Sequence, residues 1–103
     1  MTAKILYLTL KKPQFQVTLS REKQIEYRKN GDWIKSRLIG KDYALVKFTN
    51  GYGLNKPYFI CEFLGWESSK AGIHSYSNGL KVIVNEGDIA IKLGNIIESG
   101  NIK

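Results

Sequence analysis

The sequence predicts a mainly β fold of the α+β class, a small barrel of about six short strands with one or two short helices. Short apolar runs alternate with glycine-containing turns along the whole chain, and one helical pattern directly follows the first of these runs. A chain of 103 residues has room for one hydrophobic core, and closing the sheet into a barrel leaves few unpaired strand edges. We therefore expect a single domain over residues 1–103.

The first part of the chain predicts a strand, a helix and a second strand. Ile5–Leu10 is a short apolar run, which is typical of a buried strand. Pro13–Ser20 begins with a proline, which suits the first turn of a helix, and carries two large apolar residues four positions apart. The charged segment Ser20–Arg28 is expected to form a turn followed by a strand.

A second helical pattern follows the turn at Lys29–Asp32. Apolar and basic residues recur from Trp33 at a spacing that suits a helix better than a strand. We expect the Asp32 carboxylate to cap this helix, Trp33 to enter the core and Gly40 to end the element.

The middle of the chain predicts two strands joined by a tight turn. Tyr43–Thr49 alternates between apolar and polar residues, and Pro57–Trp66 is the longest apolar run and is expected to be a central strand. Glu62 lies inside this run, where an unpaired carboxylate is costly to bury, so it should have a partner. The candidates for that partner are Lys23, Arg28, Arg37 and Lys47.

The last part of the chain predicts a loop and a hairpin. Glu67–Gly79 is polar and is interpreted as a loop, with His74 as a surface residue. Lys81–Asn85 and Asp88–Leu93 are expected to form a hairpin, followed by a short strand at Asn95–Ile97.

The basic charge of the chain is concentrated at its beginning. Residues 1–41 hold ten Lys and Arg against three acidic residues, whereas residues 42–103 hold six of each. The whole net charge of +7 therefore belongs to the first two-fifths of the chain. This asymmetry predicts a surface that faces a polyanion such as RNA, DNA or a nucleotide.

Several classes of protein find no support in the sequence. The single cysteine, Cys61, cannot form an internal disulfide, and with one histidine it offers no zinc site, so we expect a buried thiol in a reducing compartment. We expect no metal and no cofactor. No apolar run is long enough to span a bilayer and no signal peptide is apparent, so we expect a cytoplasmic protein, as a monomer or weak dimer, without a membrane partner.

The segment Ser20–Arg28 is the strongest candidate for a functional site. In an extended chain Ile25 and Tyr27 would lie on one side and be buried, and Glu26 and Arg28 would stand together on the other. The ordinary interpretation is a solvated ion pair that contributes about 0–1 kcal/mol. Its position in the most basic part of the chain favours a functional role.

This segment resembles the G-x-K-x-x-E-x-R motif of the ASCH domain family, a branch of the PUA-like β-barrel superfamily. Lys23, Glu26 and Arg28 match the motif in register, and Arg21 stands at the position of its glycine. The Asn-Gly-Tyr-Gly segment at 50–53 is also similar to short stand-alone bacterial and phage members. The resemblance covers most of the chain and implies a PUA-like barrel with a cleft beside the motif.

The resemblance and the charge together predict an RNA or nucleotide binding module, with DNA as an alternative ligand. Basic side chains would meet phosphate, and an exposed aromatic ring could stack on a base. The candidate binding residues are Lys23, Glu26, Tyr27, Arg28, Lys29, Arg37, Asn50 and Tyr52.

The alternative is a small metal-independent hydrolase. Some ASCH proteins are amidohydrolases that act on N4-acylated cytidine nucleosides, although these carry threonine at the position of Glu26. Others act on or bind RNA. The resemblance therefore implies either an amidohydrolase of this kind or a ribonuclease. Lys23 would then be nucleophile or base, and Glu26 or Glu62 would transfer the proton. An accessory protein that binds a partner and has lost any chemistry is a third interpretation.

Overall fold

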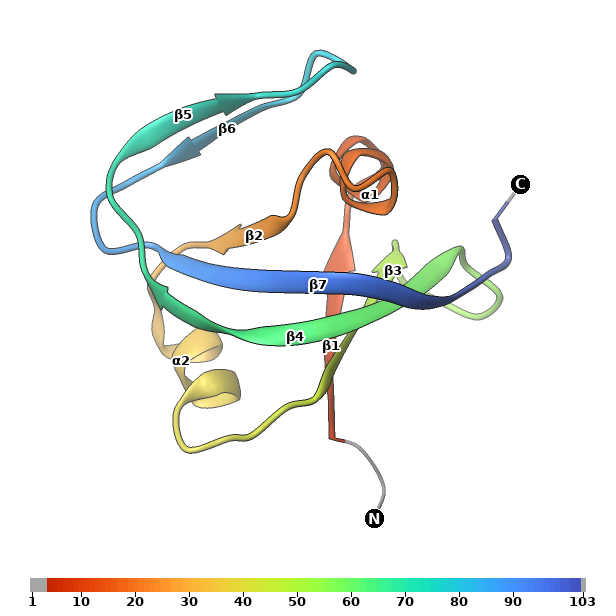
Figure 1. The fold of residues 1–103 in the computed structure, drawn as a ribbon, viewed down its shortest axis with the longest axis horizontal. Helices are drawn as coiled ribbons and strands as arrows, with labels where there is room; N and C mark the ends of the chain where they lie inside the picture. The colour runs from red at the N-terminus through yellow and green to blue at the C-terminus, as the bar shows by residue number, and fades with distance from the viewer. Residues whose placement is uncertain (1–3, 103) are drawn as a thin grey trace.

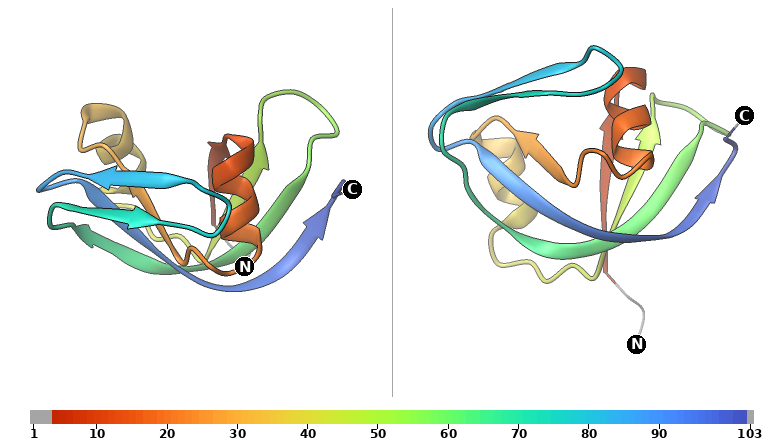
Figure 2. Two further views of the ribbon diagram at one scale, coloured as in Figure 1. Left: turned by 90° about the horizontal axis from the view of Figure 1, so that it is seen from above. Right: turned by 45° about the horizontal axis from the view of Figure 1, so that its top comes forward.

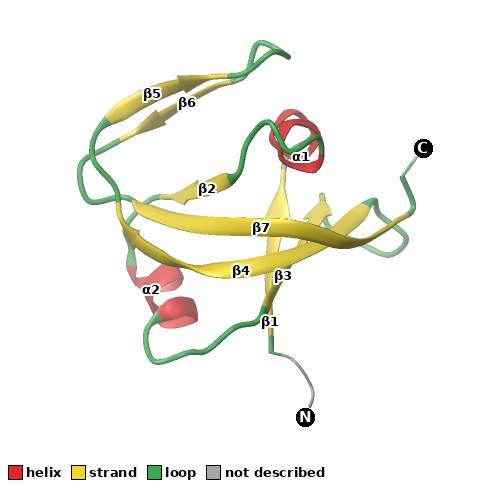
Figure 3. Cartoon of the chain, viewed as in Figure 1, coloured by secondary structure: helices red, strands yellow, loops and turns green. Residues whose placement is uncertain are grey.

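The computed structural model describes residues 4–102. These residues form one curled five-stranded sheet, a separate two-stranded hairpin and two short helices (Figures 1 and 3). The predicted mainly β, α+β fold class is confirmed, with seven strands in the described residues where about six were expected. In chain order the elements are β1 (Ile5–Leu10), α1 (Lys12–Leu19), β2 (Ile25–Arg28), α2 (Asp32–Leu38), β3 (Leu45–Asn50), β4 (Tyr58–Ser68), β5 (Gly72–Ser75), β6 (Lys81–Val84) and β7 (Ile89–Gly100).

The five-stranded sheet curls into a half-barrel whose edge strands are β1 and β2. The strand order is β1-β3-β4-β7-β2, with β1 parallel to β3 and the other neighbours antiparallel. The two longest strands, β4 and β7, bend as they cross the molecule in Figure 1, and their register shifts three times between Ile60 and Trp66. Bulges of this kind bend a strand and increase its twist, which curls the sheet.

The hydrophobic core joins the sheet to both helices. Phe59 of β4 packs against Phe15 of α1 and Phe48 of β3, with ring centroids 5.0 and 5.2 Å away. Ile34 and Leu38 of α2 belong to the same cluster. Both helices are therefore fixed against the sheet, and the segment between them is held at both ends.

The two helices are short, and α2 differs from its prediction in two details. Its N-cap is Gly31, so Asp32 is the first helical residue and its side chain does not cap the helix. Trp33 is 54% exposed instead of buried, because α2 turns Ile34 and Leu38, four residues apart, toward the core. Within residues 4–102 no helix is long and apolar enough to cross a membrane.

The predicted pairing of the last strands is wrong. β6 pairs with β5, which lies inside the segment 67–79 that was interpreted as a loop. β7 instead continues to Gly100 through the predicted separate strand at Asn95–Ile97 and pairs with both β4 and β2. The Asp88 carboxylate accepts a hydrogen bond from the Asn85 backbone, so the expected turn exists but joins β6 to a strand of another sheet.

Candidate functional site

The site begins at the turn between α1 and β2. Arg21 adopts a φ of 73°, in the left-handed region that favours glycine, at the position where the resembled motif has glycine. The Lys23 backbone N–H then bonds to the Val17 carbonyl at 2.9 Å, which folds the chain back toward α1. This turn directs the Lys23 side chain into the protein, where it is 1% exposed.

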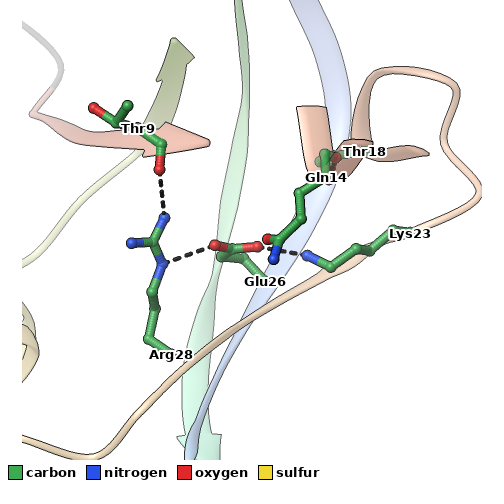
Figure 4. Close-up of polar contacts among 6 residues, drawn as sticks. All are labelled: Thr9, Gln14, Thr18, Lys23, Glu26 and Arg28. Carbon is green, nitrogen blue, oxygen red and sulfur yellow. Dashed lines mark hydrogen bonds and ion pairs between the residues drawn. The ribbon is translucent and has the colours of Figure 1, made fainter. Parts of the chain in front are cut away.

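Three charged side chains form a triad around Glu26, which Figure 4 shows, with Lys23 and Glu26 buried and Arg28 25% exposed. The Lys23 ammonium lies 2.5 Å from Glu26 Oε1, and Arg28 Nε donates to Glu26 Oε2 at 2.7 Å. The Glu26 side chain is 1% exposed, and its backbone partner on β7 is the fully buried Ile91. Two cations thus compensate one buried carboxylate, which makes its burial tolerable.

The predicted orientation of β2 is therefore wrong. Glu26 faces the interior, whereas Ile25 and Tyr27, which were expected to be buried, are half-buried. The interpretation as a solvated ion pair is wrong for the same reason. The alternation of the strand was predicted, but its inward face is the charged one, because Lys23 is buried with the carboxylate and the partly buried Arg28 also binds it.

Arg28 also joins the two edge strands of the half-barrel. Its Nη2 atom donates to the Thr9 carbonyl of β1 at 3.0 Å, while its Nε is bound to Glu26 of β2. Gln14 of α1, also drawn in Figure 4, lines the same pocket as Glu26 and Arg28. The triad is thus surrounded by β1, β2 and α1.

A pocket of about 310 Å³ opens beside the triad. Glu26 and Arg28 reach its wall, whereas Lys23 does not line it and lies behind the Glu26 carboxylate. Three cations and one carboxylate line the pocket, and the buried Lys23 balances that carboxylate, so the wall is strongly positive. The lining residues are Thr9, Leu10, Lys11, Gln14, Glu26, Tyr27, Arg28 and Lys29.

The β5–β6 hairpin lies next to this site. His74 of β5 stacks on Tyr27 of β2, with ring centroids 4.9 Å apart and an interplanar angle of 16°. The interpretation of His74 as a residue of a surface loop is therefore wrong. Burial raises the pKa of the Tyr76 phenol, and the nearby Tyr27, Glu26 and Glu22 raise it further, so Tyr76 faces the carboxylates as a neutral hydroxyl.

The tip of the hairpin is bound to the body of the protein. Ser77 donates from its backbone N–H and its hydroxyl to the Glu22 carboxylate, at 2.8 and 2.6 Å. Asn78 donates to the Pro13 carbonyl at the start of α1 at 3.0 Å. Figure 2 shows the hairpin reaching α1 from the side of β2. These contacts hold the hairpin although its strands pair with no strand of the main sheet.

Glu62 lies elsewhere and has a different partner from the one expected. Its Oε1 accepts a hydrogen bond from the Asn95 backbone N–H at 2.8 Å, and the ion pairs within residues 4–102 do not include it. Its side chain lies on Gly94, where an added Cβ would come within 2.8 Å of the Glu62 Cβ. A backbone amide thus supplies what a lysine or arginine was expected to supply.

Three further candidate residues lie outside the wall of this pocket. Arg37 sits on α2, with its guanidinium 5.3 Å from the centre of the Trp33 ring. Tyr52 is 86% exposed in the turn between β3 and β4, and Asn50 lines another pocket. The structure therefore brings Lys23, Glu26, Tyr27, Arg28 and Lys29 together and leaves these three apart.

The sequence reasoning missed several residues of the site. Thr9, Lys11 and Gln14 reach the pocket from β1 and α1, and only the tertiary fold brings them to β2. His74 and Tyr76 alternate as residues of one strand face do, a signal that the polar composition of their segment concealed.

The thiol of Cys61 is buried, as predicted, and burial raises its pKa to about 11. A thiol of this kind stays protonated near neutral pH and is a poor nucleophile. Within residues 4–102 no three His, Cys, Asp or Glu side chains gather as they would to hold a metal ion.

Comparison of the chain with protein-family models, with curated proteins and with solved structures finds no match.

Proposed function

We propose that the pocket beside the triad of Lys23, Glu26 and Arg28 binds a phosphate group of RNA or of a nucleotide. The observation that supports this proposal is the excess of cations on the wall: Lys11, Arg28 and Lys29 face one carboxylate that Lys23 already balances. Arg28 is partly desolvated, with 25% of its side chain exposed, so it attracts a phosphate more strongly than the exposed Lys11 and Lys29 do, because the surrounding dielectric constant is lower.

Arg28 is suited to the phosphate and Tyr27 to the base. The bonds to Glu26 and Thr9 engage two of the five N–H donors of Arg28 and hold its guanidinium in place. Tyr27 lines the same pocket and is fixed by its stacking on His74. A ring held in this way can stack on a base, which contributes about 1–3 kcal/mol per base.

We further propose that the chain is a single ASCH-type, PUA-like domain of bacterial or phage origin, which binds RNA or a nucleotide in the cytoplasm as a monomer or weak dimer. Support for this assignment comes from Arg21, which makes the turn that the motif's glycine would make, and from the contacts among the three matching motif residues. DNA is the alternative polymer.

The binding proposal is tested by fluorescence anisotropy with a labelled single-stranded RNA between 50 and 200 mM salt. The logarithm of the binding constant should fall linearly with the logarithm of the salt concentration, with a slope of about −0.7 for each neutralised phosphate. The variant Lys11→Gln/Lys29→Gln should reduce this slope by about 1.4 if both lysines meet phosphate. The charge-matched control Lys35→Gln/Lys41→Gln changes two exposed lysines outside the pocket and should leave the slope within about 0.5. A binding constant that does not change between 50 and 200 mM salt, or no detectable binding at 50 mM salt, contradicts the proposal.

A second candidate function is hydrolysis, and the observation that favours it is that the Glu26 carboxylate, paired with Lys23 on its inner side, reaches the pocket wall. Glu26 reaches the pocket and could move a proton, whereas Lys23 lies behind that carboxylate, outside the pocket wall, and would act only by exchanging a proton with it. The test is the hydrolysis of N4-acetylcytidine, and of a short RNA, by the natural chain and by Lys23→Met with a matching circular dichroism spectrum. Equal rates, or no turnover by the natural chain, end this candidate.

A further inference from the structure

A second pocket, larger than the first, lies on the other side of α1. Its volume is about 680 Å³, within the range of about 300–1,000 Å³ that small-molecule sites have. Figure 2 shows α1 between the hairpin on one side and the β3–β4 loop and the end of β7 on the other. The lining residues are Lys12, Phe15, Gln16, Leu19, Ser20, Asn50, Asn55, Lys56, Pro57, Asn101 and Ile102.

The lining of this second pocket combines an apolar floor with amide side chains and positive charge. Phe15 and Leu19 of α1 face Pro57 from the other wall. Two lysines and no acidic residue take part, so the electrostatic potential favours an anionic ligand. Four primary amides, each with two donors and one acceptor oxygen, complete the lining: Gln16, Asn50, Asn55 and Asn101.

This chemistry suits a nucleobase attached to a phosphate. Amide side chains match the neighbouring donors and acceptors on the edges of the bases, and the apolar residues can contact their faces. Lys12 and Lys56 stand where a phosphate attached to such a base would be attracted. A purely apolar ligand would cover amide groups without offering them hydrogen bonds, apart from the Asn101 amide, which already donates to the Lys56 carbonyl.

The two pockets adjoin at the start of α1. Lys11 lines the first pocket and Lys12 the second. Leu10 and Asn50 are paired across β1 and β3, and they too line one pocket each. The first turn of α1 carries no acidic residue and its N-cap makes no side-chain bond, so nothing there repels a phosphate backbone.

We propose that the second pocket holds a neighbouring nucleotide of a single-stranded oligonucleotide whose backbone crosses Lys11 and Lys12 from the first pocket. This inference rests on the proposed function and makes it more specific. The ligand class becomes a single strand of at least two nucleotides, rather than a free mononucleotide.

The length of the ligand provides the first test. The natural chain is titrated with uridine and adenosine monophosphates and with RNA and DNA hexamers of mixed sequence at 50 mM salt. The hexamer should bind at least tenfold more tightly than either mononucleotide, because it occupies both pockets at once. The RNA and DNA hexamers distinguish the two sources of the same base and phosphate chemistry.

A variant of the second pocket provides the second test. Asn55 has a φ of 59°, which glycine adopts without strain, so Asn55→Gly removes the amide and keeps the backbone. The variant Asn55→Gly/Lys56→Gln should weaken hexamer binding at least fivefold. It should leave mononucleotide binding within twofold, because a single phosphate is attracted more strongly by the three cations of the first pocket than by the two lysines of the second. The control Lys35→Gln, at an exposed position on α2, should change hexamer affinity less than twofold.

The outcomes separate this inference from the proposed function. A hexamer that binds no more tightly than a mononucleotide overturns the inference and leaves the phosphate site intact. So does a variant that weakens both ligands equally or neither. If neither the mononucleotides nor the hexamers bind, the proposed function fails, and the inference with it.

Discussion

Glu26 carries two roles at once, because one of its oxygens meets a buried ammonium and the other a guanidinium at a pocket wall. The Lys23–Glu26 contact is 1% exposed on both sides. A buried charge without a partner is costly, whereas a paired one is about neutral for stability compared with apolar residues. The pair therefore specifies one arrangement of the turn and β2, and it keeps the guanidinium of Arg28 oriented toward the pocket.

Replacing Glu26 tests this description at a single residue. Glu26→Gln leaves the Lys23 ammonium buried without a carboxylate, and the free energy of unfolding should fall by about 3–5 kcal/mol. The measurement is urea unfolding followed by circular dichroism. The matched control is Glu67→Gln, since Glu67 pairs with Lys92 at 3.4 Å with side chains 61% and 46% exposed, and it should cost less than about 1 kcal/mol.

Two outcomes would contradict the residue-scale account. A loss below about 1 kcal/mol for Glu26→Gln would mean that water or another group replaces the carboxylate. The apolar double variant Lys23→Met/Glu26→Leu should recover most of the lost stability, because it removes both charges together. If the double variant is no more stable than Glu26→Gln, pairing of the charges is not what the single variant lost.

The sequence predicted which residues matter in this segment but not which way they face. The period-two pattern was sufficient to group Glu26 with Arg28. Hydrophobicity then assigned the interior to Ile25 and Tyr27, because a burial rule based on single residues treats a carboxylate as a surface group. The compensation comes from Lys23 and from the fold, so it is invisible until the three charges are placed together.

At the scale of elements, the β5–β6 hairpin is attached to the rest of the described chain by few contacts. Its two strands form a sheet of their own, and its tip depends on Ser77 and Asn78 for hydrogen bonds to the body. Tyr27 and His74 add one aromatic contact. Elements with few contacts open locally at a lower free energy than the core does.

Removing the carboxylate that holds the tip should loosen this hairpin alone. Glu22→Ala removes both bonds to Ser77, so amide hydrogen exchange in Gly72–Ser75 and Lys81–Val84 should accelerate about fivefold or more. Exchange in β4 and β7 should not change. The control Glu98→Ala removes another exposed carboxylate, which accepts a bond from Tyr58, and should leave the hairpin amides as they are. Unchanged hydrogen exchange of the hairpin amides in Glu22→Ala would show that the bonds between Ser77 and Glu22 do not hold the hairpin.

The sequence located the strands better than it located their pairing. The strands at Ile5–Leu10 and at the middle of the chain were predicted closely because their apolar alternation is strong. Adjacent strands with a short turn were expected to pair, yet β6 and β7 belong to different sheets. Pairing depends on contacts between residues distant in sequence, which local patterns do not encode. Here Ser77 and Asn78 at the hairpin tip donate hydrogen bonds to the Glu22 carboxylate and the Pro13 carbonyl.

At the scale of the whole molecule, the half-barrel has a seam between its edge strands β1 and β2. Arg28 crosses this seam, bound on one side to Glu26 and on the other to the Thr9 carbonyl. The first pocket opens at the same place and is lined from both strands. The first pocket and the gap between the two edge strands of the sheet therefore coincide.

A lysine at position 28 keeps the positive charge and loses the planar guanidinium, whose Nε and Nη2 atoms bond to Glu26 and Thr9 on the two sides of the seam. Arg28→Lys can bond to Glu26 or to Thr9 but does not reproduce both bonds in the same geometry. We expect a loss of about 1–2 kcal/mol, which lowers the Tm of a domain of this size by roughly 4–16 °C in thermal unfolding. Arg37→Lys, at an exposed arginine over Trp33, is the control and should change stability by less than about 0.5 kcal/mol. A shift as small as that of the control would remove Arg28 from the closure of the sheet.

The seam gives an occupied pocket a consequence beyond recognition. A phosphate bound by both Lys11, which directly follows β1, and Arg28 of β2 would link the two edge strands reversibly. A ligand at one hundred times its Kd raises the free energy of unfolding by about 2.7 kcal/mol. Proteases attack transiently opened chains, so the loaded protein would outlast the empty one. Turnover of the protein would then follow the supply of its ligand.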